Sequence, residues 1–324
     1  MVTRQWNFSL FCTTCITYLI FLSFAPWTKE GHAAPPLHSI VVQASSPSSS
    51  LISIIDDRGK KIELKTPARR VIALYGAFNE ILAALGQERR ILARTKADIT
   101  PPSIQRLPAI GTHMRPNVEL VLSLKPDLIL QATGRRQAME PVRALERTGL
   151  KVAVFNMNSI DGLYSAMERI GILLGCQDRA RAVTKEMKTR IHSIQERLPS
   201  AGQLQRPRIF FEVRYPNLLG AGGGNIVNEI ITLAGGENCF SNIHKKFVRP
   251  NIEAIIKCDP DYYIIQKGPM NKEPGDPAKR PNFILIRAIR EGHWIVVPEE
   301  LFSRPTPRIV EAMERLYSIL HERL

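Results

Sequence analysis

The sequence predicts an α/β protein of two similar lobes joined by a single long rigid helix, with a ligand cleft between the lobes. Three observations support this fold class. Short apolar runs alternate with helical spacing along most of the chain, which is typical of mainly parallel sheets covered on both faces. One phrase of sequence occurs once in each half of the chain. Between the halves lies a helical segment of about 20 residues, which at roughly 30 Å is long enough to cross a lobe.

The first 33 residues have the layout of a secretory signal peptide. Arg4 supplies a positive charge, and an apolar run follows from Phe8 to Ala25. Gly31 and Ala33 supply the small residues that precede a cleavage site. We therefore expect cleavage after Ala33 and export of the mature chain.

The cleavage site and the fate of this N-terminal segment have alternatives. Cleavage after Ala25 is disfavoured because Pro26 follows it. An uncleaved anchor is the second alternative, since the apolar run approaches the length of a membrane span. Cys12 and Cys15 do not follow the pattern of a lipoprotein signal, so no lipid anchor is expected. Residues 34–50 are rich in proline and serine and are expected to form a linker.

Residues 51–158 are expected to form the N-terminal lobe. Apolar residues alternate around Asp57–Lys60, which predicts a hairpin over 51–65. One face of this hairpin would carry Ile52, Ile54, Ile62 and Leu64. The strands expected after it are 71–74, 91–93, 128–130 and 152–155, and the helices are 79–86, 117–124 and 141–148.

Residues 159–199 are expected to form a helical connector. Its first apolar stripe consists of Leu163, Met167, Ile170 and Leu174, and ends at Gly175. Its second stripe consists of Val183, Met187, Ile191, Ile194 and Leu198. The second stripe predicts one long helix from Ala180 to Leu198, and this helix is the expected rigid link.

Residues 200–324 are expected to repeat the pattern as the C-terminal lobe. The expected strands are 209–213, 262–265 and 294–297, and the expected helices are 226–234, 252–257, 283–290 and 307–324. Gly222, Gly223 and Gly224 precede the first of these helices. They lack the Lys-Ser/Thr of a phosphate-binding loop, so a tight turn is their expected role.

The repeated phrase places a glutamate at the same point in each lobe. Arg115-Pro116-Asn117-Val118-Glu119 precedes one helix, and Arg249-Pro250-Asn251-Ile252-Glu253 precedes another. A carboxylate in the first helical turn is favourable by ~0.3–1 kcal/mol. That effect explains an acid at this position, but not the whole matched phrase. An internal repeat of this kind indicates two lobes that face each other across a cleft.

Charge restricts the class of partner. The net charge is +14, and because Arg4, Lys29 and Glu30 sum to +1, the mature chain keeps +13. The basic residues are scattered, with no basic arm and no zinc-finger spacing, so no nucleic acid is expected as a partner. A small anionic ligand, or plain surface charge, fits better.

Three cysteines remain after removal of the signal peptide. Cys239 and Cys258 are able to pair in an oxidising compartment. The alternative is that these two and Cys176 are buried as small apolar side chains. Their spacing fits no zinc site.

The motifs together resemble the periplasmic binding proteins of ferric-siderophore, haem and vitamin B12 importers. The resemblance covers about Ile52 to Leu324 and rests on the order of Arg70–Leu74, Asn79–Gly86, Pro116–Glu119, Leu124–Ile129, Ala234–Asn238 and Arg304–Arg308. It implies two Rossmann-like lobes, little lobe closure, a periplasmic location and a monomer. It implies neither a cofactor nor an enzymatic activity.

The resemblance also implies a partner. One exposed glutamate on each lobe, by position Glu119 and Glu253, would pair with arginines of an ABC permease dimer at the inner membrane. Exposed acid–arginine pairs suit orientation and rapid association. The chain would deliver a small-molecule metal chelate to that permease.

Ligands of open α/β sheets bind at the carboxyl ends of the strands. The loops there supply the candidate ligand-binding residues Tyr75, Arg94, His113, Arg115, Arg214, Tyr215, Phe247, Arg249, Arg304 and Arg308. Arginine pairs with carboxylate, phosphate or catecholate oxygens, and aromatic rings flank planar ligands. The basic loops favour an anionic ferric siderophore. A corrinoid of the vitamin B12 type is a close alternative, followed by haem or an oxyanion such as molybdate.

His113 has two interpretations. A loop histidine is able to ligate haem iron or cobalt, but more often it forms hydrogen bonds or is solvated. Haem-binding relatives carry a tyrosine in the loop that here reads Lys96–Pro101, and its absence disfavours haem. Six scattered histidines in the mature chain form no cluster, so no protein metal site is expected. An exported hydrolase is the rival class, although no Gly-x-Ser-x-Gly or His-Glu-x-x-His motif occurs.

Overall fold

A computed structural model describes residues 51–133, 136–199 and 206–322. The signal peptide predicted over 1–33, with Cys12 and Cys15, and the linker predicted over 34–50 lie outside these residues. Residues 49–324 form one compact unit. Among the described helices, none combines the length and the apolar character that a membrane span requires.

The N-terminal lobe begins with the predicted hairpin. Strands β1 (Ile52–Ile55) and β2 (Lys61–Leu64) are antiparallel, and Ile54 lies opposite Ile62. A four-stranded parallel sheet follows in the order β4-β3-β7-β8. Its strands are β3 (Val71–Ala73), β4 (Ile91–Ala93), β7 (Leu128–Ala132) and β8 (Val152–Phe155). The lobe also contains α1 (Ala77–Ala84), α2 (Val118–Ser123), α3 (Arg136–Arg147) and a small hairpin of β5 (Gly111–Thr112) and β6 (Arg115–Pro116).

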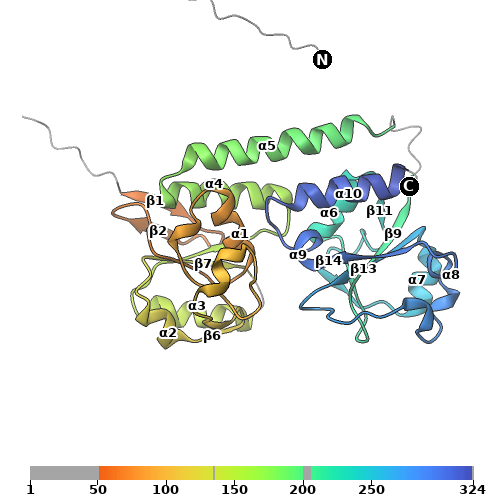
Figure 1. The fold of residues 1–324 in the computed structure, drawn as a ribbon, viewed down its shortest axis with the longest axis horizontal. Coiled ribbons are helices and arrows are strands. Elements are labelled where there is room, and N and C mark those ends of the chain that lie inside the picture. The colour runs from red at the N-terminus through yellow and green to blue at the C-terminus, as the bar shows by residue number, and fades with distance from the viewer. Residues whose placement is uncertain (1–50, 134–135, 200–205, 323–324) are drawn as a thin grey trace, which may run out of the picture. The chain divides into compact units, whose positions relative to one another are not determined.

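Two antiparallel helices form the connector (Figure 1). Helix α4 (Ile160–Leu174) ends at Gly175, whose φ of 66° is the left-handed conformation that glycine adopts without strain. Helix α5 (Gln177–Glu196) has 20 residues, so it is roughly 30 Å long. It packs on α4 and also on the C-terminal helix α10 (Ile309–His321), where Arg190 and Glu314 lie 2.7 Å apart. The predicted long helix is therefore present, three residues longer at its start and two residues shorter at its end.

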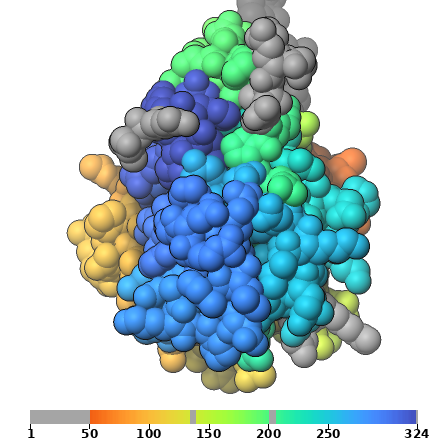
Figure 2. All heavy atoms as spheres, turned by 90° about the vertical axis from the view of Figure 1, so that its right-hand side faces the viewer, coloured from red at the N-terminus to blue at the C-terminus, as the bar shows by residue number. Residues whose placement is uncertain are grey.

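The C-terminal lobe, coloured cyan to blue, faces the viewer in Figure 2. Its sheet has the order β12-β10-β9-β13-β14, and a short β11 (Glu237–Asn238) pairs with β9. The other strands are β9 (Arg208–Arg214), β10 (Leu219–Ala221), β12 (Phe247–Val248), β13 (Tyr262–Lys267) and β14 (Trp294–Pro298). The helices before α10 are α6 (Ile226–Leu233), α7 (Ile252–Cys258), α8 (Arg287–Arg290) and α9 (Glu299–Phe302).

Some boundaries differ from the sequence-based expectation. Helix α3 begins at Arg136 rather than at Pro141, so the proline lies inside the helix and not at its start. The helix expected over 283–290 is broken at Ile286, whose buried and extended backbone separates a 3-10 turn from α8. Strands β10 and β12 are antiparallel to their neighbours and were not predicted, because β10 is interrupted by Gly220 and β12 has only two residues, so neither forms an apolar run.

The glycine run before α6 forms a tight turn, as expected. A Cβ atom on Gly222 would collide with the carbonyl oxygen of Lys245, and one on Gly223 with that of Ser241. Only glycine lets the segment around Ser241–Lys245 approach so closely. Cys239 and Cys258 form a disulfide within this lobe, and Cys176 is a free, partly buried thiol. The pairing alternative is therefore the one found in the structure.

Candidate ligand site and docking face

The carboxyl ends of the parallel strands of both lobes meet at one junction. Strands β3, β4, β7 and β8 run parallel in the first lobe, and β9, β13 and β14 run parallel in the second. The segments that follow these strands supply Tyr75, Glu80 and Thr100 of the first lobe and Arg304 and Arg308 of the second. We name this region the lobe junction. It is the place where the chemistry of open α/β sheets predicts a ligand.

A buried carboxylate lies at the centre of the lobe junction. This carboxylate belongs to Glu80 of α1. Its Oε1 is 3.6 Å from Nη1 of Arg304, and its Oε2 is 3.6 Å from Nη1 of Arg308. The hydroxyl of Thr100 donates a hydrogen bond of 3.0 Å to the same carboxylate. Burial raises the pKa of Glu80, although Thr100 and both arginines oppose the rise. The two arginines predicted to hold an anionic ligand therefore face a carboxylate of the opposite lobe.

Tyr75 lies close to this carboxylate, and His113 lies beside Tyr75. Their ring centroids are 5.8 Å apart, and His113 is in the two-residue turn between β5 and β6. Burial raises the pKa of Tyr75 to about 12, with Arg304 opposing the rise and Glu299 adding to it. Partial desolvation lowers the pKa of His113, with Asp98 opposing the change. Across the junction, Lys246 donates a hydrogen bond of 2.9 Å to Asn158.

The remaining basic candidates have separate surroundings. The guanidinium of Arg94 turns back onto its own loop and donates to the carbonyl oxygens of Thr95 and Asp98. Arg115 is exposed in β6. Arg214 donates to the carbonyl oxygen of Asn217 in the turn after β9.

Phe247 and Arg249 line a second part of the C-terminal lobe. They belong to a cavity of about 490 Å³ together with Leu219, Ile243, Lys245, Lys246 and Val248. Lys246 joins this cavity to the lobe junction through its bond to Asn158. Tyr215 is not in the cavity, because its ring packs on Arg280 and Phe283.

Several polar residues at the junction were not among the candidates. Glu80 and Glu299 are 7% and 8% exposed, and their burial raises the pKa of both carboxyls. The adjacent polar pair Asn79 and Glu80 in the otherwise apolar helix α1 is the sequence signal that could have identified Glu80. Within the described ranges, no cluster of three or more histidine, cysteine, aspartate or glutamate side chains is arranged to hold a metal ion.

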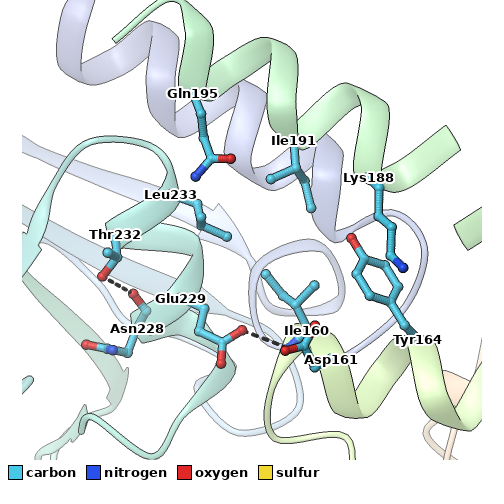
Figure 3. A pocket seen from close by; sticks show the side chains of 10 residues that line it. All are labelled: Ile160, Asp161, Tyr164, Lys188, Ile191, Gln195, Asn228, Glu229, Thr232 and Leu233. Atoms are coloured by element: carbon cyan, nitrogen blue, oxygen red, sulfur yellow. Dashed lines mark hydrogen bonds between the residues drawn. The ribbon is translucent and has the colours of Figure 1, made fainter. Parts of the chain in front are cut away.

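A larger cavity of about 530 Å³ lies where the connector helices meet α6 (Figure 3). Its side chains come from α4, α5 and α6, and Glu229 accepts a hydrogen bond of 2.7 Å from the backbone N–H of Ile160. This bond satisfies an orphan N–H at the start of α4. The cavity thus belongs to the packing of the connector against the C-terminal lobe.

The repeated phrase forms the same structure twice. The side chains of Asn117 and Asn251 each accept a hydrogen bond of 3.0 Å from the backbone N–H three residues later, and so cap α2 and α7. Each cap places an exposed glutamate, Glu119 or Glu253, in the first turn of its helix. The two lobes therefore present equivalent exposed carboxylates.

Comparison with known proteins agrees with this architecture. A family model described as "Periplasmic binding protein" matches residues 71–301. The "Uncharacterized ABC transporter substrate-binding lipoprotein YvrC" of Bacillus subtilis is 27% identical over 82% of this chain and 84% of its own length. A "Cobalamin-binding protein" of Halobacterium salinarum is 26% identical over 96% of this chain and 84% of its own length.

A solved structure gives the same result. A "possible an iron-binding (periplasmic solute-binding) protein" of Staphylococcus epidermidis superposes with a TM-score of 0.65 at 26% identity, covering 79% of this chain and all of that one. These comparisons indicate that this chain is the substrate-binding component of an ABC transporter. Such a component binds a small ligand, works with a membrane permease and is not an enzyme. The chain belongs to the periplasmic binding protein family.

Proposed function

We propose that this protein is exported to the periplasm, binds a metal chelate of the corrinoid type at the lobe junction and delivers it to an ABC permease. The observation that carries the ligand class is the pairing of Arg304 and Arg308 with Glu80. The carboxylate of Glu80 opposes the positive charges of both arginines. Two further carboxylates, those of Asp98 and Glu299, lie close enough to Tyr75 to act on its pKa. The centre of the junction is therefore not a basic pocket.

A corrinoid suits such a junction better than an anion does. Its edge carries amide groups, which accept hydrogen bonds from arginine and donate them to carboxylates. Its broad apolar faces suit aromatic side chains such as Tyr75. The printed name of the Halobacterium salinarum relative, which aligns with 96% of this chain, supports the same class.

An anionic ferric siderophore is the second candidate. The cavity beside the junction is lined by Lys245, Lys246 and Arg249 around the ring of Phe247. Three cations around an aromatic ring would attract an anionic catecholate or carboxylate chelate. This site would bind its ligand with a steep dependence on salt.

Export is supported by the disulfide between Cys239 and Cys258, since disulfides persist in oxidising compartments such as the periplasm. Delivery is supported by the paired exposed glutamates, which would meet arginines of the two permease subunits. We expect the protein to act as a monomer, with cleavage of the signal peptide after Ala33.

The ligand class is tested by purifying the mature protein from its exported compartment and recording its absorbance and native mass. Titrations with cyanocobalamin, haemin, a ferric catecholate and molybdate follow, each at two salt concentrations. We expect one cyanocobalamin per chain, with an affinity that changes little with salt. Binding of the ferric catecholate alone, weakened by salt, would replace the corrinoid proposal with the siderophore.

A further inference from the structure

A buried ion pair lies beneath the carboxyl ends of β9 and β13. Glu212 is 0% exposed. Arg280 donates two hydrogen bonds to its carboxylate, one of 2.5 Å from Nη1 to Oε2 and one of 3.1 Å from Nη2 to Oε1. The hydroxyl of Tyr263 donates to Oε2 at 2.6 Å, and the amide of Asn271 donates to Oε1 at 3.1 Å. The carboxylate thus accepts four hydrogen bonds, which uses its full capacity.

This ion pair anchors a long irregular segment. Residues 268–286 connect β13 to α8, and Arg280 reaches from there into the lobe. Arg280 donates to the carbonyl oxygen of Pro274 within the segment at 2.7 Å, and Asn271 donates to that of Gln266 in β13 at 3.0 Å. The backbone N–H of Met270 donates to Glu299 at 2.8 Å. The segment is therefore fixed to the strand ends at several points.

The same guanidinium supports an aromatic ring. The central carbon of Arg280 lies 4.0 Å from the ring centroid of Tyr215, and Phe283 meets that ring edge-on at 5.5 Å. The backbone N–H of Tyr215 donates to Asn271 at 3.3 Å. Tyr215 follows β9 at the same sheet edge as Arg304 and is only partly buried.

The energetics indicate a role other than stability. A buried ion pair loses about as much in desolvation as it gains in attraction, so apolar residues of the same volume would serve the core equally well. The best-attested use of such a pair is to fix one arrangement among several. Here it fixes the position of an aromatic ring at the ligand edge of the sheet.

We propose that Arg280 is a positioning residue for ligand recognition, and that its pairing with Glu212 holds the Tyr215 ring as a preformed wall for a planar chelate. This inference rests on the proposed function for the nature of the ligand. A ring that is already fixed loses little entropy on binding, so the pairing would raise affinity without touching the ligand. Arg280 acts through Tyr215.

A cycle of variants tests this coupling. Tyr215→Ala removes the ring, and the double variant Glu212→Gln with Arg280→Met removes both buried charges, so that no unpaired charge is left. Each change should weaken chelate binding by about tenfold or more. Their combination should be no weaker than Tyr215→Ala alone, because the two changes act on one contact. Additive losses, or wild-type affinity in the double variant, would overturn the proposal.

A ligand-free measurement separates this inference from the proposed function. Amide hydrogen exchange in residues 214–218 and 268–280 should speed up in the Glu212→Gln, Arg280→Met variant. The matched control is Asp56→Asn with Arg58→Met, which breaks a hydrogen-bonded pair of the N-terminal lobe. It should leave both exchange in 214–218 and chelate affinity unchanged. Unchanged exchange in the test variant overturns the positioning role, whereas a wild-type protein that binds no chelate refutes only the proposed function.

Discussion

Oε1 of Glu80 in the N-terminal lobe lies 3.6 Å from Nη1 of Arg304 in the C-terminal lobe. Both residues are buried, with 7% and 8% of their surfaces exposed. Glu80 Oε2 and Arg304 Nη1 are buried without a hydrogen-bond partner. Buried polar atoms seldom stay unpaired, so both atoms keep the capacity to form a hydrogen bond with a further polar group, such as a ligand amide. The pairing also links the lobes through charge, since Glu80 is the carboxylate that faces both Arg304 and Arg308.

Replacing Glu80 with glutamine should change the ligand preference. The substitution keeps the shape of the side chain but leaves Arg304 and Arg308 without their carboxylate. We expect affinity for an anionic ferric catecholate to rise about tenfold at low salt, and affinity for cyanocobalamin to fall. Titrations at two salt concentrations measure both. Glu146→Gln, at an ion-paired glutamate remote from the junction, is the control. Equal anion affinity in wild type and Glu80→Gln would contradict the assignment.

Glu229 should make stability fall as pH rises. Burial raises the pKa of Glu229, while the N–H of Ile160 opposes the rise. The folded state therefore holds this proton more tightly than the unfolded state, and the contribution is lost as pH rises from 4.5 through the folded pKa. We expect the free energy of unfolding to decline less across this window in Glu229→Gln than in wild type. Chemical denaturation at pH 4 to 7 gives the comparison.

Asp56 supplies a control of opposite sign. Its burial would raise the pKa, but hydrogen bonds from Arg58 and from the backbone lower it below the ordinary value of 3.8. Stability from Asp56 is therefore present above pH 3.8 and lost as pH falls through the lower folded pKa. Asp56→Asn should reduce stability throughout the window from pH 4 to 7. A parallel response of the two variants to pH would show that the signs are assigned wrongly.

The disulfide should contribute to the stability of the C-terminal lobe. Cys239 and Cys258 are 19 residues apart, and closing a loop of this length constrains the unfolded chain by about 3 kcal/mol. The double variant Cys239→Ser, Cys258→Ser should unfold at lower denaturant concentration than wild type. Reductant should shift wild type towards the variant and leave the variant unaffected. Cys176→Ser is the control, since Cys176 is a free thiol.

The sequence predicted the repeated architecture because its signals are local. Caps, glycine stops and apolar runs each depend on neighbouring residues, and Gly175 and Asn117 show how a single residue fixes a helix end. Strands β10 and β12 were missed because neither forms an apolar run like those of β3 and β4: β10 is interrupted by Gly220, and β12 has only two residues. Their pairing is set by tertiary contacts.

The candidate site was predicted less completely, for the same physical reason. Loop positions could be inferred from strand ends, and Tyr75, His113 and Arg304 do lie at the lobe junction. Their partners could not be inferred, because Glu80 lies 224 positions from Arg304 in the chain. An arginine whose charge is opposed looks the same in sequence as one that is free to bind an anion.

The equivalent capped glutamates predict a docking defect that leaves ligand binding intact. Glu119 and Glu253 are exposed in the first turns of α2 and α7, and neither lies in the lobe junction. Glu119→Ala with Glu253→Ala should therefore abolish transport by the permease while chelate affinity and thermal stability stay at wild-type values. Each single variant should give an intermediate rate of transport, since each lobe would meet one permease subunit.

The control for lost surface charge is Glu168→Ala with Glu186→Ala, at two exposed glutamates of the connector helices. Transport at the wild-type rate by the Glu119, Glu253 variant would show that the permease recognises another surface, and lost ligand affinity would show that these residues act at the site instead.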